Sequence, residues 1–241
     1  MKSDRVFYSA AAAVNLTIVL IGFMPFYLRG HGHNERIIAP EIYSIVVVHG
    51  TAITAWYVLS LLQALLISVK KPRLHMKLGW LAVALVPVVA VSGAMVAIRS
   101  ARASGAFDFF GMVYTDFLLV MLMEMIMFSV FVVLGLMNRR QPAFHRAMML
   151  LASLSMVMGG AVRIPALVAL LGGDHSRVAF FGPLFVLGAL IIVGRWIMTR
   201  SFDRWFAQGF ACLAIVYLGA EQLSRTDVWH HFSKGLLATV K

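Results

Sequence analysis

Residues 41–98 read EIYSIVVVHGTAITAWYVLSLLQALLISVKKPRLHMKLGWLAVALVPVVAVSGAMVAI, and this stretch decides the fold. Two apolar runs, at about 41–69 and 76–98, flank the short basic segment KKPRLH. A helix that crosses the hydrocarbon core of a bilayer needs roughly 20 mostly apolar residues, and each run reaches that length. The stretch therefore predicts two transmembrane helices joined by a tight turn.

The rest of the chain follows the same pattern of apolar runs separated by short polar connections. The other five windows lie at about 6–28, 109–137, 145–171, 178–198 and 205–223. Of the 241 residues, 61% are hydrophobic and only 13% are charged, whereas soluble domains carry roughly 25% charged residues. We therefore expect an all-α, polytopic membrane helix bundle with seven transmembrane helices, in one domain that covers residues 1–223.

The basic residues predict the orientation of the chain in the membrane. The net charge is +11, but the bases lie in short clusters between apolar runs, so we exclude nucleic acid as a partner. The densest clusters, at 70–77 and 139–146, fall on the same side as the amino terminus. Loops rich in Lys and Arg stay in the cytoplasm, so we expect a cytoplasmic amino terminus and a periplasmic carboxyl terminus.

The tail at 224–241 has a different pattern. Val228, Phe232, Leu236 and Val240 follow one another at steps of four, with polar residues between them. This spacing is typical of an interfacial amphipathic helix on the outer leaflet, although a frayed tail also fits the sequence. The lone Cys212 lies in an apolar run, which excludes a disulfide framework and a covalently attached c-type haem.

Two stretches resemble each other across the chain. Residues 70–77 read KKPRLHMK and residues 139–146 read RRQPAFHR, and each places a Pro three residues ahead of a His. The apolar runs on either side make two helix hairpins of the same orientation, spans 2–3 and spans 4–5. We interpret them as a weak parallel repeat, related by a pseudo-twofold axis along the membrane normal.

The two histidines of this repeat, His75 and His145, lie at the cytoplasmic boundary of spans three and five. Histidines there can simply sit among lipid headgroups. Alternatively, they supply both axial ligands of one b-type haem. In that case Arg73 and Arg146 would hold its propionates, and Gly79 would let the flat ring approach its helix.

A second group of ionisable residues lies deeper in the membrane, towards the outer side. Its members are His49, Asp116, Arg163 and Glu221, with Glu124 near the middle. Such groups cost roughly 2.5 kcal/mol or more to insert, so we expect Arg163 to pair with Asp116 or Glu221. The layer is either a buried ion-pair set that fixes helix register or a catalytic, ligand or proton site.

The second and third spans resemble a group of uncharacterised bacterial multi-pass membrane proteins. The shared pattern is His49, Trp56, Gln63, Arg73, His75, Leu78 and Gly79. The hairpin layout is also similar to the ascorbate-reducible di-haem b cytochromes, in which histidines on alternate core helices pair across a four-helix bundle. His75 and His145 match one such pair, but His49 faces Asp116 in place of a second histidine. The resemblance thus implies at most one haem.

Together these patterns predict a redox protein of the bacterial inner membrane that passes electrons to or from quinol or an outer-face partner. Three alternatives remain open. The deep His and carboxylate layer could form an enzyme site for a lipid-soluble substrate, with Zn, Fe or Cu as a metal in place of haem. The same groups could serve a proton-coupled carrier, or the chain could be a structural subunit of a larger membrane complex.

Overall fold

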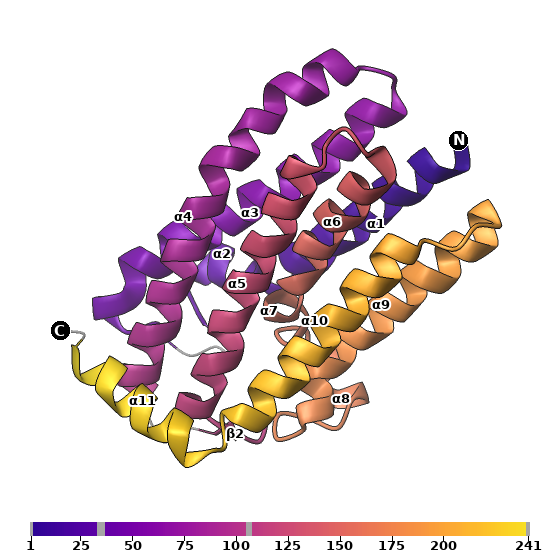
Figure 1. Ribbon diagram of the computed structural model, residues 1–241. Coiled ribbons are helices and arrows are strands. Elements are labelled where there is room, and N and C mark those ends of the chain that lie inside the picture. The colour runs from indigo at the N-terminus through magenta and orange to yellow at the C-terminus, as the bar shows by residue number, and fades with distance from the viewer. Residues whose placement is uncertain (1, 33–36, 105–107, 240–241) are drawn as a thin grey trace.

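In the computed structural model, which describes residues 2–32, 37–104 and 108–239, the basic segment turns the chain between two long helices. These are α3 (Pro40–Ser68) and α4 (Pro72–Ser104) (Figure 1). Lys70 adopts a left-handed conformation with φ of 58°, and Pro72 begins α4, where its fixed φ suits a first helical residue. The predicted hairpin of spans 2–3 is therefore present.

The same construction is repeated in the second hairpin, α5 (Tyr114–Met137) and α6 (Pro142–Ser155), where Pro142 again begins the second helix. The bundle is completed by α1 (Lys2–Gly22), α2 (Met24–Arg29), α9 (Arg177–Thr199) and α10 (Arg204–Leu223). Within the described ranges, six helices are long and apolar enough to cross a membrane, namely α1, α3, α4, α5, α9 and α10. The chain is thus an all-α bundle with the helices of a membrane protein.

The window at 145–171 is not one continuous helix, so that expectation is wrong. It divides into α6, a short α7 (Met158–Ala161) and α8 (Pro165–Leu170). The physical causes are local. Gly159 and Gly160 weaken the helix, and Pro165 forces Ile164 out of the helical region, to φ −97° and ψ 103°.

The interrupted helix α6 occupies the centre of the bundle, with α5, α10, α1, α9 and α3 around it. Its last carbonyls have no partner within the helix and cannot reach water at this depth. Two tyrosines from neighbouring helices satisfy them. The Tyr57 hydroxyl donates to the Ser153 carbonyl at 2.7 Å, and the Tyr217 hydroxyl donates to the Ser155 carbonyl at 2.7 Å. The helix can therefore end inside the protein.

The break also lets α1 approach α7 very closely, and this contact leads to a prediction. A Cβ atom added to Gly22 would overlap the carbonyl of Gly160. We expect Gly22→Ala to destabilise the protein by about 2–3 kcal/mol and to lower the Tm in detergent by about 5–10 °C. Gly219→Ala is the matched control, since a Cβ there meets nothing within 4 Å. Equal Tm values for the two variants would contradict this close packing.

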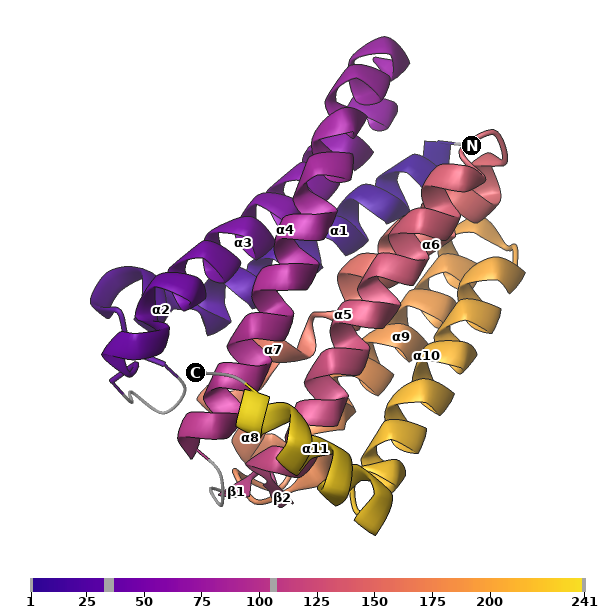
Figure 2. The ribbon, with the colours of Figure 1, turned by 60° about the vertical axis from the view of Figure 1, so that its left-hand side comes forward.

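Two small elements close the end of the bundle that lies opposite the two basic turns. Strands β1 (Asp108–Phe109) and β2 (Met112–Val113) form an antiparallel hairpin ahead of α5. The tail forms α11 (Asp227–Thr239), which lies across the ends of α4 and α5 (Figure 2); residues 240–241 lie outside the described residues. Trp229 anchors this helix, because its Nε1 donates to the Thr115 carbonyl at 2.9 Å.

Candidate functional site

The two histidines of the repeated stretches lie next to each other, in the first turns of α4 and α6. The ring centroids of His75 and His145 are 6.2 Å apart, and the ring planes are at 89°. The Nδ1 atom of His75 lies 3.3 Å from the Gln63 carbonyl, and that of His145 lies 2.8 Å from the Gly135 carbonyl. A carbonyl accepts only from a protonated nitrogen, so Nδ1 carries the proton and Nε2 keeps its lone pair.

These two hydrogen bonds have the same form in the two hairpins. In each hairpin the histidine of the second helix donates to a carbonyl near the end of the first helix. The backbone N–H groups of His75 and His145 donate to Lys71 and Gln141, at 3.1 and 2.9 Å. Each helix begins at a proline, so the histidine three residues later lies in the first turn. Each imidazole lies close to the imidazole of the other hairpin.

Open space and unpaired polar atoms lie beside this pair. Gly79 is one turn beyond His75 on the same face of α4, and a Cβ at Gly79 would meet nothing within 4 Å. The side-chain amide of Gln63 is buried, and neither its oxygen nor its nitrogen has a hydrogen-bond partner among the described residues. Such buried unpaired groups are rare and need an explanation; here they belong to the residue whose backbone carbonyl lies 3.3 Å from His75 Nδ1.

Of the two arginines expected beside the histidines, only Arg73 is exposed. Arg146 instead pairs with Asp4 of α1 at 3.5 Å and lies 5.1 Å from the centroid of the Tyr8 ring. These contacts do not support the expectation that Arg146 holds a haem propionate. Because Asp4 holds it, Arg146 belongs to a contact between α6 and α1.

That contact is part of a charged cluster that sequence reasoning missed. Arg195 of α9 bonds to Asp4 at 3.1 Å and pairs with Asp203 at 3.5 Å, while the Tyr8 hydroxyl donates to Asp203 at 2.5 Å. Asp203 also caps α10 by accepting from the Phe206 N–H. Arg195 lies inside an apolar window, and this was the signal that could have revealed the cluster.

His49, Glu124 and Arg163 lie in the interior of the bundle. His49 contacts the Ser92 hydroxyl through Nδ1 at 3.1 Å. Glu124 is 9% exposed, and among the described residues no hydrogen bond reaches its Oε1. Its carboxylate interacts electrostatically with Arg163. Arg163 also donates to the Gly159 carbonyl and lies 4.5 Å from the centroid of the Phe23 ring.

Asp116 and Glu221 do not join this interior group, so the expected pairing of Arg163 with either of them is wrong. Asp116 contacts Nε2 of His230 on α11 at 3.0 Å. Glu221 pairs with Arg177 at 2.8 Å and with Arg225. Arg163 lies just after the break in the helix and donates to the Gly159 carbonyl. The partner of Asp116 is His230, which belongs to α11.

Residues 2–32, 37–104 and 108–239 contain no group of three or more His, Cys, Asp or Glu side chains arranged to hold a metal ion. The pair His75 and His145 can supply two nitrogen ligands, which is the number that an iron in a porphyrin takes from a protein with two axial imidazoles. No family model, curated protein or solved structure matches the chain. The class that the fold defines is therefore a helical membrane protein.

Proposed function

We propose that the protein is a bacterial inner-membrane redox protein that holds one b-type haem between α4 and α6. The observation that carries this proposal is the 6.2 Å separation of the His75 and His145 ring centroids. Imidazole nitrogens bind first-row metals at about 2 Å and the ring centroid lies about 1 Å further, so two axial imidazoles have centroids about 6 Å apart.

The surrounding residues suit the same cofactor. Gly79 leaves room for a flat ring against α4, and the buried amide of Gln63 offers an unpaired donor and acceptor beside it. Arg73 and Lys77 are exposed on the first two turns of α4, where long basic side chains can reach propionates. When bound, a haem of this kind supplies a one-electron redox couple.

The chain's own residues would orient and protect that couple. The hydrogen bonds from His75 and His145 to backbone carbonyls fix the tautomer and direction of each ring, as partners of ligating histidines do in other metal sites. If His75 and His145 both held the haem iron, they would leave no position for an external ligand, and the group would supply electron transfer. Quinol or an outer-face partner would exchange the electrons.

The interior group of His49, Glu124 and Arg163 supports a quinol as the partner. Oxidation of a quinol to a quinone releases two electrons and two protons. A bound haem would supply the one-electron couple for this oxidation, with an outer-face partner as electron acceptor, while the unpaired Glu124 oxygen and the His49 ring would offer places for the two protons. The same unpaired oxygen favours a second candidate function, an enzyme or proton-coupled carrier that acts without haem.

The seven-span arrangement is also part of the proposal, with α6, α7 and α8 together making the interrupted fifth crossing. Non-helical backbone is tolerated at membrane depth where protein surrounds it, and α6 is buried among its neighbours. We expect reporter fusions after Lys71 and Arg140 to be cytoplasmic, and fusions after Arg102 and at the carboxyl terminus to be periplasmic. The reverse pattern would refute this orientation.

The direct test of the function is an absorption spectrum of protein purified from haem-replete cells. We expect a reducible Soret and α band corresponding to one haem per chain. Gly79→Leu should remove this absorption by filling the open space, whereas Gly219→Leu, at an equally open glycine on α10, should leave it intact. Colourless wild-type protein would rule out the redox function, and would leave the interior carboxylate site as the candidate.

A further inference from the structure

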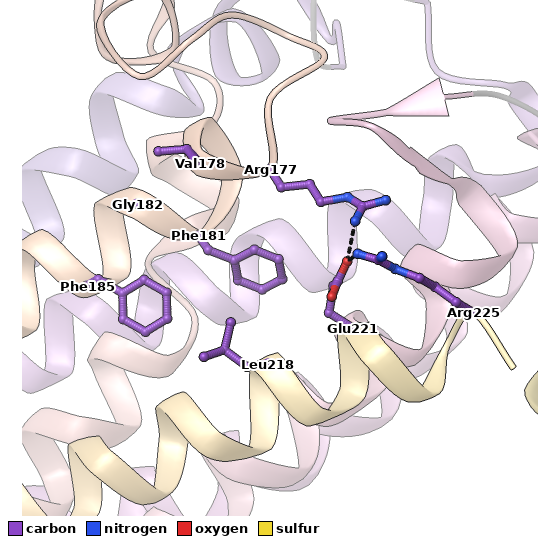
Figure 3. Close-up of a pocket in the computed structure, with 8 residues that line it drawn as sticks. All are labelled: Arg177, Val178, Phe181, Gly182, Phe185, Leu218, Glu221 and Arg225. Carbon is purple, nitrogen blue, oxygen red and sulfur yellow. Dashed lines mark hydrogen bonds and ion pairs between the residues drawn. The ribbon is translucent and has the colours of Figure 1, made fainter.

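A groove with a cavity volume of about 270 Å³ opens between α9 and α10 near the outer end of the bundle (Figure 3). One end is charged, with Arg177, Glu221 and Arg225, and the rest is apolar, lined by Phe181, Phe185 and Leu218 among others. Figure 3 shows the two arginines meeting at Glu221, with the rings of Phe181 and Phe185 to their left. The groove is thus amphipathic along its length.

The charged end carries an excess of positive charge. Glu221 is only 6% exposed and pairs with both guanidinium groups, at 2.8 Å to Arg177 and also to Arg225. Among the described residues that line the groove, two guanidinium groups face one carboxylate, which gives this end an excess of one positive charge. Their side chains are 40% and 42% exposed, so this charge is accessible at the mouth of the groove.

The arginines are also held in place before any ligand arrives. Arg177 is the first residue of α9 and donates from Nη2 to the Gly111 carbonyl in the β-hairpin turn at 2.9 Å. Arg225 follows the end of α10 and lies four residues from Glu221. Because fewer side-chain rotamers must be ordered on binding, such an arrangement favours tight recognition of an anion.

The apolar part of the groove runs from the charged end towards the middle of the bundle. Leu218 lies nearly one turn before Glu221 on α10, and Phe181 and Phe185 follow Arg177 at one-turn steps on α9. Leu218 and the neighbouring Val178 are largely exposed. In a membrane this wall would face hydrocarbon, so it suits an acyl chain better than it suits water.

We propose that this groove binds one anionic glycerophospholipid, with its phosphate at Arg177 and Arg225 and an acyl chain along Phe181, Phe185 and Leu218. Arginine matches the geometry of phosphate with two parallel hydrogen bonds. The position at helix ends, level with lipid headgroups, brings the phosphate and the arginines to the same depth. A small anion alone would leave the apolar wall uncovered. The site does not depend on bound haem.

The test is a titration of the detergent-purified protein with phosphatidylglycerol or phosphatidylcholine, followed by native mass spectrometry. We expect one phosphatidylglycerol to bind about tenfold more tightly than phosphatidylcholine, because a net positive site attracts the anionic lipid. Arg225→Gln should remove this preference. Leu218→Trp keeps every charge but fills the groove, and should weaken both lipids by about tenfold. Arg102→Gln, a change at an exposed arginine of α4, should change neither value.

Inorganic phosphate distinguishes the headgroup from a free anion. We expect millimolar phosphate to leave phosphatidylglycerol bound, since it cannot replace the contacts of the acyl chain. The proposal is overturned if phosphate displaces the lipid, if the two lipids bind equally, or if both Arg225→Gln and Leu218→Trp bind phosphatidylglycerol as the wild type does. If Arg225→Gln does not fold, the Leu218→Trp variant and the comparison of the two lipids still test whether the groove binds an anionic lipid.

Discussion

If the proposed haem is present, we expect His75→Ala and His145→Ala each to lose essentially all of it, which Soret absorbance per purified chain would measure. The two rings are 6.2 Å apart at the edge of the bundle, and neither has a nearby histidine that could replace it among the described residues. Loss of a hydrogen-bonded support alone costs about 10–100-fold in metal affinity. Loss of an axial ligand should therefore cost at least that factor.

The controls for this experiment are two other histidines. His175→Ala removes an imidazole whose side chain is 86% exposed at the opposite end, and His49→Ala removes one in the interior next to Ser92. Both variants should keep the haem. If His49→Ala also lost it, or if either His75→Ala or His145→Ala kept a normal spectrum, the assignment of the two axial ligands would be wrong.

Arg163→Met should lower the stability of the protein by about 2–3 kcal/mol, seen as a fall in the Tm of about 5–10 °C in detergent. The change removes the contacts of Arg163 with the Gly159 carbonyl and the Phe23 ring, and it removes the cation that interacts electrostatically with the buried Glu124 side chain. A matched substitution at an exposed arginine, Arg102→Met, should change the Tm by little.

The double variant Arg163→Met with Glu124→Gln distinguishes a structural pair from a working site. Adding Glu124→Gln should restore only the part of the stability that depends on a cation near Glu124, because the contacts with the Gly159 carbonyl and the Phe23 ring stay lost. We expect this variant to fold, to keep its haem, and to be reduced by quinol at least about tenfold more slowly than the wild type. Wild-type rates of reduction would show that Glu124 and Arg163 serve only the packing of the bundle.

The apolar runs were sufficient to predict a helical membrane bundle, because the length of a run and its lack of charge are local properties. The sequence also allowed us to predict that His75 and His145 lie at the same end of the bundle. Pro72 and Pro142 each begin a helix and place a histidine in its first turn, and two hairpins of one orientation bring those turns to the same side. The interruption at 156–165 had local signals as well, in Gly159, Gly160 and Pro165.

The partners of the charged residues could not be predicted in this way. Asp4 meets Arg195 and Tyr8 meets Asp203 across 191 and 195 residues of chain. His230 reaches Asp116 only because α11 folds back across α5. Hydropathy and periodicity give the depth of a side chain and its face on a helix. They do not say which helix lies against that face.

The sequence by itself thus determined the membrane class and the hairpin turns. Only the tertiary structure decided that Arg163 interacts with Glu124, that Glu221 holds two arginines at the mouth of a groove, and that His75 and His145 are in contact. The physical reason is that neighbours are chosen by the packing of the whole bundle, in which each helix must satisfy several contacts at once.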